Sequence, residues 1–240
     1  MLRITTKTAT NLSCRCLHSR TGNHSNHFNI ESICSEDNIR RCIKSMQSMQ
    51  PQVKLSQKQH DTEAAVLIPL CTHNDELSLL YTVRSAKLSK HVRQVSFPGG
   101  LRDADESWEN CAIRETEEEI GIPNEQIQIY GTGRMIVPAR PPSIMPIVGF
   151  VNRFDIRSLK LNSDEVESCF TVPLRELCRN ENKRHTQFKG GYCVPTFIGA
   201  EKRIWGITGL ITHLFLTALL PKDIYSHPMK FVSKYRPVPS

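Results

Sequence analysis

Three glutamates, Glu115, Glu118 and Glu119, are spaced so that a helix would bring their carboxylates to one face. Like charges at these spacings repel each other by about a few tenths of a kcal/mol per pair, so an ordinary surface helix avoids them. A hard divalent cation with oxygen ligands reverses that cost, because the carboxylates then share a positive charge. The spacing therefore indicates a metal site. The competing interpretation is a solvated acidic helix.

Two further residues fit the same arrangement. Arg114 directly precedes the first glutamate, and Glu106 stands eight residues before Arg114, close to two helical turns. An ion pair between them would brace the carboxylate site. The surrounding residues predict a loop, a helix and a second loop: Gly99 and Gly100 permit positive φ angles, Ser107 is a suitable N-cap, and Gly121 is a suitable helix end.

Residues 100–122 fit the pattern G-x5-E-x7-R-E-U-x-E-E-x-G-U, where U is a bulky aliphatic residue, at every position except Thr116. This run resembles the Nudix box, the signature of enzymes that cleave a diphosphate linked to another moiety. The resemblance implies a Nudix fold, an α/β architecture with a mixed sheet in an α/β/α sandwich. It also implies that Glu115, Glu118 and Glu119 bind magnesium or manganese, while Arg114 and Glu106 brace them.

A second signature lies immediately upstream, in residues 79–100. It is similar to the motif L-L-T-x-R-[SA]-x3-R-x3-G-x3-F-P-G-G of the coenzyme A diphosphatase subfamily, including its mitochondrial members, but Ser89 replaces the arginine and Arg93 replaces the glycine. The resemblance implies hydrolysis of coenzyme A and its thioesters to 3′,5′-ADP and 4′-phosphopantetheine or its acyl form. The alternatives are hydrolysis of another nucleoside diphosphate, such as ADP-ribose or a dinucleotide, and a non-catalytic Nudix module that binds nucleotide or protein.

The upstream signature is strongly basic, with no acid between Leu77 and Gly100. Cations would meet the diphosphate and 3′-phosphate of coenzyme A through charge-assisted hydrogen bonds. A solvated basic loop or a nucleic-acid patch would have a similar composition. The residues assigned to substrate binding are Arg84, Lys87, Lys90, His91, Arg93, Gly99 and Gly100.

One more acid belongs to the candidate site. The segment Asn162-Ser163-Asp164-Glu165-Val166 resembles the N-x-x-E-V sequence of the same subfamily. Glu165 would then add a metal ligand or a general base, because a carboxylate near the metal can orient water. Capping of a helix or strand end is the alternative role.

Charge and composition limit the partners. The chain has 240 residues and a net charge of +7, but residues 1–30 contain four cations and no acid, which leaves 27 basic and 24 acidic residues elsewhere. That balance does not call for a nucleic acid, so we expect a small-molecule substrate. Residues 1–30 have the acid-free, hydroxyl-rich character of a mitochondrial transit peptide, with a cytosolic tail as the alternative. The nine cysteines form no C-x-x-C pair, so we expect free thiols.

The remaining pattern divides the chain into an N-terminal helical segment at 31–60, a Nudix hydrolase domain at 61–220 and a C-terminal tail at 221–240. The apolar helix ending near Leu220 is too short and too interrupted for a membrane span. A monomer and a homo-oligomer both remain open. The strands are predicted at 64–70, 77–83, 128–132, 134–137 and 144–151.

Overall fold

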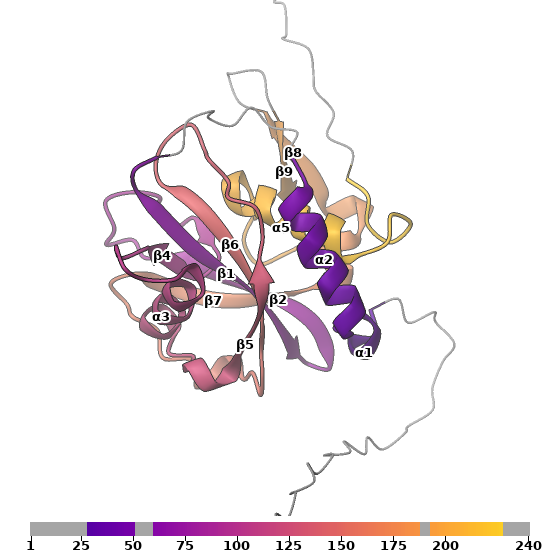
Figure 1. The fold of residues 1–240 in the computed structure, drawn as a ribbon, viewed down its shortest axis with the longest axis horizontal. Helices are drawn as coiled ribbons and strands as arrows, with labels where there is room; N and C mark the ends of the chain where they lie inside the picture. Colours follow the sequence, from indigo (N-terminus) through magenta and orange to yellow (C-terminus); the bar gives the residue numbers. More distant parts are fainter. Residues whose placement is uncertain (1–27, 51–59, 188–192, 228–240) are drawn as a thin grey trace, which may run out of the picture.

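A mixed β-sheet with helices on both faces forms the body of the protein in the computed structural model, which describes residues 28–50, 60–187 and 193–227 (Figure 1). The helices are α1 (Ile30–Ile33), α2 (Glu36–Ser48), α3 (Trp108–Ile120), α4 (Leu174–Cys178) and α5 (Gly206–Leu219). The strands are β1 (Glu63–His73), β2 (Glu76–Arg84), β3 (Val95–Ser96), β4 (Gly99–Leu101), β5 (Ile127–Thr132), β6 (Ser143–Val151), β7 (Val166–Pro173), β8 (Lys183–Gln187) and β9 (Cys193–Phe197).

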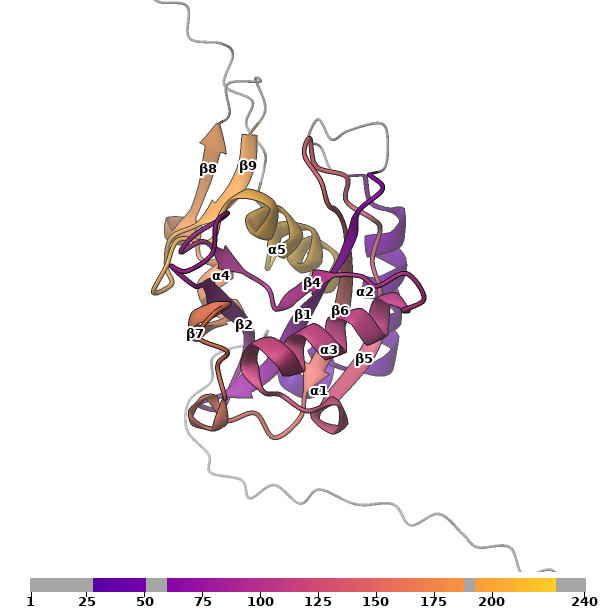
Figure 2. The same cartoon turned by 90° about the vertical axis from the view of Figure 1, so that its left-hand side faces the viewer.

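The sheet has seven strands in the order β3-β2-β1-β6-β5, while β4 pairs with β1 and β7 pairs with β2. Strands β1 and β6 run parallel and the other pairs are antiparallel, so the predicted mixed sheet is confirmed. Strands β8 and β9 form a separate hairpin, which projects beside α5 (Figure 2). The short β4 is the segment that carries the glycines of the candidate site to the middle of the sheet.

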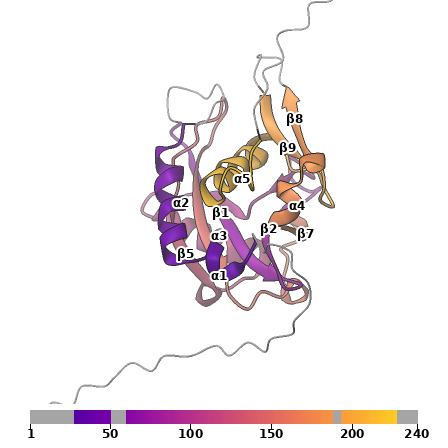
Figure 3. The ribbon, with the colours of Figure 1, turned by 90° about the vertical axis from the view of Figure 1, so that its right-hand side faces the viewer.

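The two faces of the sheet bury different residues. Ala65 and Leu67 of β1 belong to the apolar cluster that contains Ala112 and Ile120 of α3. Ile68 and its neighbours on the opposite face belong to a larger cluster shared with α2 and α5 (Figure 3). Because side chains alternate along a strand, β1 supplies both layers, and α3 is held against the face opposite to α2 and α5.

Most of the predicted elements are present. Strands β1 and β2 form the expected hairpin, whose turn residues Asn74 and Asp75 both have positive φ, 50° and 61°. The strand predicted at 134–137 is wrong. Only Ile136 pairs, in an isolated bridge with Ile144, and Pro138 follows without an amide proton to extend a ladder.

The N-terminal segment is helical where the structure describes it. Helix α2 begins at Ser35, whose hydroxyl accepts a hydrogen bond from the Asn38 amide, and it buries Ile39 and Met46. Residues 51–59 of the predicted helical segment lie outside the described residues, as do residues 1–27 of the predicted transit peptide. Those two assignments stay predictions.

The C-terminal part departs from the predicted tail. Residues 221–227 pack on the domain, since Tyr225 is 2% exposed and His227 is 7% exposed. Burial of these aromatic rings extends the packed domain beyond residue 220. Within the ranges that the structure describes, no helix combines the length and the apolar character that a bilayer crossing requires.

Three histidines meet where this segment joins the rest of the domain. The ring centroid of His227 lies 4.7 Å from that of His185 on β8 and 5.7 Å from that of His213 on α5. Burial lowers the pKa of His213 to about 4 and the pKa of His227 to about 3, and the neighbouring histidines add to both shifts. The neutral form of both imidazoles is therefore required for the packed arrangement.

These shifts predict acid-sensitive stability. In the unfolded chain both imidazoles are protonated below about pH 6.5. In the folded chain His213 is protonated only as the pH nears about 4, and His227 only as it nears about 3. Stability from these residues is present above pH 6.5 and is lost as the pH falls. We expect the melting temperature to drop between pH 7.5 and 5, and to drop less steeply in the His227→Phe variant. Equal slopes for the two proteins would contradict this assignment.

Candidate active site

Helix α3 is bounded by the residues that its sequence predicts. The hydroxyl of Ser107 accepts a hydrogen bond from the Asn110 amide at 3.1 Å, and Gly121 ends the helix with φ of 72°. Thr116, the position that departs from the Nudix pattern, is buried, and its hydroxyl donates to the carbonyl of Ala112 at 2.6 Å. The added polar group is therefore satisfied inside the helix, so it leaves no orphan donor in the core.

Arg114 lies at the centre of the acidic face. Its Nε and its second terminal nitrogen donate to the two carboxylate oxygens of Glu106, both at 2.9 Å, so the expected ion pair is present and bidentate. Its first terminal nitrogen donates to Glu115 at 2.9 Å and to Glu118 at 3.2 Å. The hydrogen bonds from Arg114 hold the pKa of Glu106 below its usual range. One guanidinium thus orders three carboxylates.

Glu119 is the most buried carboxylate of the set. It is 5% exposed, and Oε2 accepts a hydrogen bond of 3.3 Å from the Gly99 amide. Burial raises its pKa to about 8; the Gly99 amide and the Arg84 charge oppose that rise, while Glu115 and Glu165 add to it. Burial also raises the pKa of Glu115. Burial thus favours the protonated form of Glu119, and a positive charge beside these acids would favour their ionised forms.

The two glycines of β4 are required by close approach. A Cβ on Gly99 would lie 2.2 Å from the Ala65 carbonyl oxygen, and its φ is 148°. A Cβ on Gly100 would lie 2.3 Å from Oε2 of Glu115. Only glycine lets the backbone pass between β1 and the acidic face of α3. The pair assigned to substrate binding therefore also shapes the carboxylate site.

The donor set fits a hard divalent cation. All of its atoms are carboxylate oxygens, and the buried Glu119 lacks a full counter-charge. In the arrangement described, Glu115 and Glu118 are turned toward Arg114. Within residues 28–50, 60–187 and 193–227, no three acidic, histidine or cysteine side chains are already gathered as a ligand group. Binding a cation would therefore require these glutamates to exchange partners with Arg114.

The basic loop between β2 and β3 is less free than its sequence indicates. Lys87 forms a 2.8 Å ion pair with Asp164, Arg93 forms a 3.2 Å ion pair with Glu167, and His91 bonds to Gln94. Lys90 is exposed. No local sequence signal points to the two acids, because each is more than 70 residues from its partner. Two cations of the loop are therefore already paired with acids of the segment that contains residues 164–167.

The position that the subfamily motif gives to glycine explains one departure. Arg93 has φ of 55°, and His91 nearby has φ of 54°. The left-handed conformation costs a non-glycine residue roughly 1–2 kcal/mol. The loop keeps the backbone shape that favours glycine while carrying an arginine.

Arg84 is a loop cation whose charge acts on the acidic site. It influences the pKa of Glu119, and its Nε is buried without a hydrogen-bond partner among the described residues. An unsatisfied buried donor costs about 1–3 kcal/mol. A phosphate oxygen placed beside the carboxylate site would satisfy it.

Glu165 joins the site from a different part of the chain. It is half-buried, and its charge raises the pKa of both Glu115 and Glu119, which places it beside them. The turn that carries it is tied to the end of α3, since the backbone amides of Lys160 and Asn162 donate to the backbone carbonyls of Ile120 and Glu119. Glu165 is thus held against the helix that carries the other acids.

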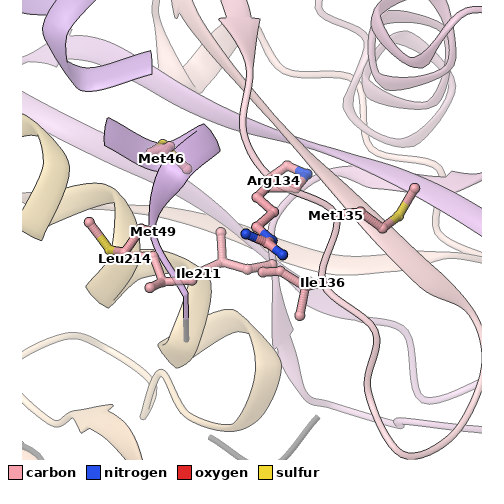
Figure 4. A pocket seen from close by; sticks show the side chains of 8 residues that line it. Met46, Met49, Arg134, Met135, Ile136, Ile211 and Leu214 are labelled. Carbon is pink, nitrogen blue, oxygen red and sulfur yellow. The ribbon is translucent and has the colours of Figure 1, made fainter. Parts of the chain in front are cut away.

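A small pit on the other face of the sheet is separate from this site (Figure 4). It has room for about 10 Å³, roughly one water molecule. Its lining is mainly apolar and consists of Met46, Met49, Arg134, Met135, Ile136, Pro146, Ile211 and Leu214. Its size excludes it as a nucleotide site in this arrangement.

The comparisons with known proteins identify the family of the chain. The NUDIX domain family matches residues 61–191. The human protein named mitochondrial coenzyme A diphosphatase NUDT8 is 38% identical over 66% of this chain and 70% of its own length. The Caenorhabditis elegans protein named Nudix hydrolase 3 is 34% identical over 73% of this chain and 80% of its own length.

A solved C. elegans Ap4A hydrolase complex is 26% identical, with a TM-score of 0.40, and the match covers 46% of this chain and 80% of that one. The family match over more than half of the chain, together with the human relative, defines the class of the protein. The chain belongs to the Nudix family and is a Nudix hydrolase.

The two glycines predict separable defects. In Gly99→Ala the new methyl meets backbone at 2.2 Å, so we expect a melting temperature lower by several degrees. In Gly100→Ala it meets the mobile end of Glu115, so we expect a smaller thermal change and a loss of turnover of at least about tenfold. Thermal melts and diphosphate hydrolysis assays on both variants test this. A Gly100→Ala enzyme with normal turnover would refute the role given to that contact.

Proposed function

We propose that the protein is a coenzyme A diphosphatase, which hydrolyses the diphosphate of coenzyme A and its thioesters to 3′,5′-ADP and 4′-phosphopantetheine or its acyl form. The observation that carries this proposal is the position of Arg84, with its unsatisfied buried donor, beside the buried carboxylate of Glu119. Anion recognition and the acidic site then meet at one place. The name of the human relative, a mitochondrial coenzyme A diphosphatase, supports the same substrate class.

Glu115, Glu118 and Glu119 would hold magnesium or manganese. When bound, such a cation neutralises diphosphate charge and favours formation of a hydroxide nucleophile. Arg114, anchored by Glu106, would hold the glutamates near the site until a cation displaces it as their partner. Because it is already hydrogen-bonded to two of them, it limits their rotamers at little further entropic cost.

The substrate would be oriented by groups of β2, the basic loop and β4. Arg84 would donate to the 3′-phosphate, and Lys90 would supply a second, exposed cation. The Gly99-Gly100 backbone lets the carboxylates of Glu119 and Glu115 lie directly against β4, where the diphosphate would be cleaved. Glu165 would accept a proton from the attacking water or complete the ligand set, a role supported by its effect on the pKa of Glu115 and Glu119.

One observation favours a second candidate, a Nudix hydrolase of ADP-ribose or a dinucleotide. Lys87 and Arg93 are already paired with acids, so fewer free cations remain for a 3′-phosphate than the loop sequence indicates. A purely binding module is disfavoured, because loss of activity commonly follows loss of a single ligand and all three glutamates of the box are intact.

The first test removes one proposed metal ligand. Glu118→Gln keeps the side-chain volume and removes its charge, so we expect turnover to fall by at least about 10²-fold. Glu117→Gln is the matched control, since it removes the same charge from an adjacent exposed position outside the proposed ligand set. Near-normal turnover of Glu118→Gln at saturating magnesium, or an equal loss in the control, would remove Glu118 from the site.

The second test concerns the substrate. If the loop recognises the 3′-phosphate, kcat/KM for coenzyme A should exceed that for dephospho-coenzyme A by about tenfold or more, as expected for a lost charged hydrogen bond. Arg84→Ala should narrow that ratio. Equal efficiencies would reject 3′-phosphate recognition, and a clear preference for ADP-ribose would favour the second candidate.

We also propose a mitochondrial location, supported by the acid-free residues 1–30 and by the mitochondrial name of the relative. Residues 1–30 fused to a fluorescent protein should direct it to mitochondria, and their deletion should leave catalysis unchanged. A diffuse cytosolic signal from the full-length chain would reject targeting without affecting the enzymatic proposal.

A further inference from the structure

The basic loop faces a segment of opposite charge. Lys87 Nζ lies 2.8 Å from Asp164 and donates to the hydroxyl of Ser163 at 3.3 Å. Arg93 Nε lies 3.2 Å from Glu167. The hydrogen bond and charge of Lys87 lower the pKa of Asp164, so this acid is ionised near neutral pH. Two of the five titratable basic groups assigned to substrate binding therefore meet a carboxylate before any substrate arrives.

Exposed ion pairs of this kind are weak and their side chains fluctuate. Here the two backbones are fixed beside each other by Ser85, which is 4% exposed. Its amide donates to the Glu165 carbonyl at 2.8 Å, and its hydroxyl donates to the Ser163 carbonyl at 2.9 Å. Because this joint is buried, the acids remain close to the loop whichever rotamers they adopt. Their effect is that of a fixed local negative charge.

The adjacent strand pairing reinforces the joint. Strand β7 begins at Val166, which pairs with Arg84, and the register between β2 and β7 shifts at Val83 and Arg84. Such an irregularity next to a functional site redirects a side chain. The acids thus flank the start of a strand whose first residue is the register partner of Arg84, rather than belonging to an independent loop.

We infer that Asp164 and Glu167 are specificity-determining residues that weaken the loop's binding of an additional phosphate. The inference rests on the proposed function of the loop in substrate binding. A phosphate that approaches Lys87 or Arg93 must compete with the carboxylates and is repelled by them. The loop then discriminates less strongly for a 3′-phosphate than its cation content indicates, and Arg84 and Lys90 carry most of the discrimination.

Binding of product-like probes tests this without relying on catalysis. In Asp164→Asn combined with Glu167→Gln, we expect the Kd for 3′,5′-ADP to fall by about threefold for each carboxylate removed, as for unit charges some 6–7 Å apart in a water-like medium. The Kd for 5′-AMP, which lacks the 3′-phosphate, should change much less. Because the pairs are exposed, the gain should shrink as salt is raised.

A matched control comes from another exposed ion pair. Asp155 is paired with Arg157 outside this loop, so Asp155→Asn removes the same charge and should leave both Kd values unchanged. An equal gain in the control, equal tightening of both ligands, or no change would overturn the inference. Weaker binding of 3′,5′-ADP would also overturn it, because the acids would then be ordering the cations for phosphate.

The two proposals fail differently. If the variant tightens 3′,5′-ADP selectively while coenzyme A is not hydrolysed, the charge balance of the loop is right and the substrate is wrong. If coenzyme A is hydrolysed but the variant leaves the ratio of the Kd values for 3′,5′-ADP and 5′-AMP unaltered, the enzyme assignment stands and the role of Asp164 and Glu167 is rejected.

Discussion

The burial of one carboxylate, that of Glu119, is the constraint around which the site is arranged. A buried charge is costly unless it is paired or hydrogen-bonded, and Glu119 has the Gly99 amide and the nearby Arg84 charge to offset that cost. To bring the amide that close, β4 must run between β1 and α3, where a Cβ on either Gly99 or Gly100 would collide. The path of β4 between β1 and α3 thus determines both how α3 packs on the sheet and which groups surround its glutamates.

Local rules account for much that the sequence predicts correctly. Ser107 and Gly121 bound α3 because capping chemistry depends on neighbouring residues, and the turn at Asn74 and Asp75 is set by two adjacent residues that tolerate positive φ. The mixed sheet and the Nudix fold follow from the motif and are confirmed. The spacing of Glu106 and Arg114 also indicates their ion pair, because both lie within one loop and helix.

Non-local contacts account for what sequence reasoning missed. The acids opposite the basic loop come from a segment beyond β6, and composition within the loop carries no information about them. The burial of Tyr225 and His227 depends on contacts with His213 and His185, which lie on other elements, so the local sequence does not indicate it. The stretch at 134–137 has the apolar character of a strand, but only Ile136 finds a partner. The roles of the site residues, the domain limits and the targeting segment stay predictions.

The attachment of the Glu165 turn to the end of α3 also bears on how such a protein can change length. The Lys160 and Asn162 amides cap the last carbonyls of the helix, so the chain leaves α3 and returns to it at one place. The segment between Gly121 and Lys160, which includes β5 and β6, therefore starts and ends at fixed positions beside the end of α3. Lengthening a segment whose ends are fixed costs little additional free energy. Insertions at its surface turns could therefore accumulate during evolution while the acids of the site kept their mutual distances.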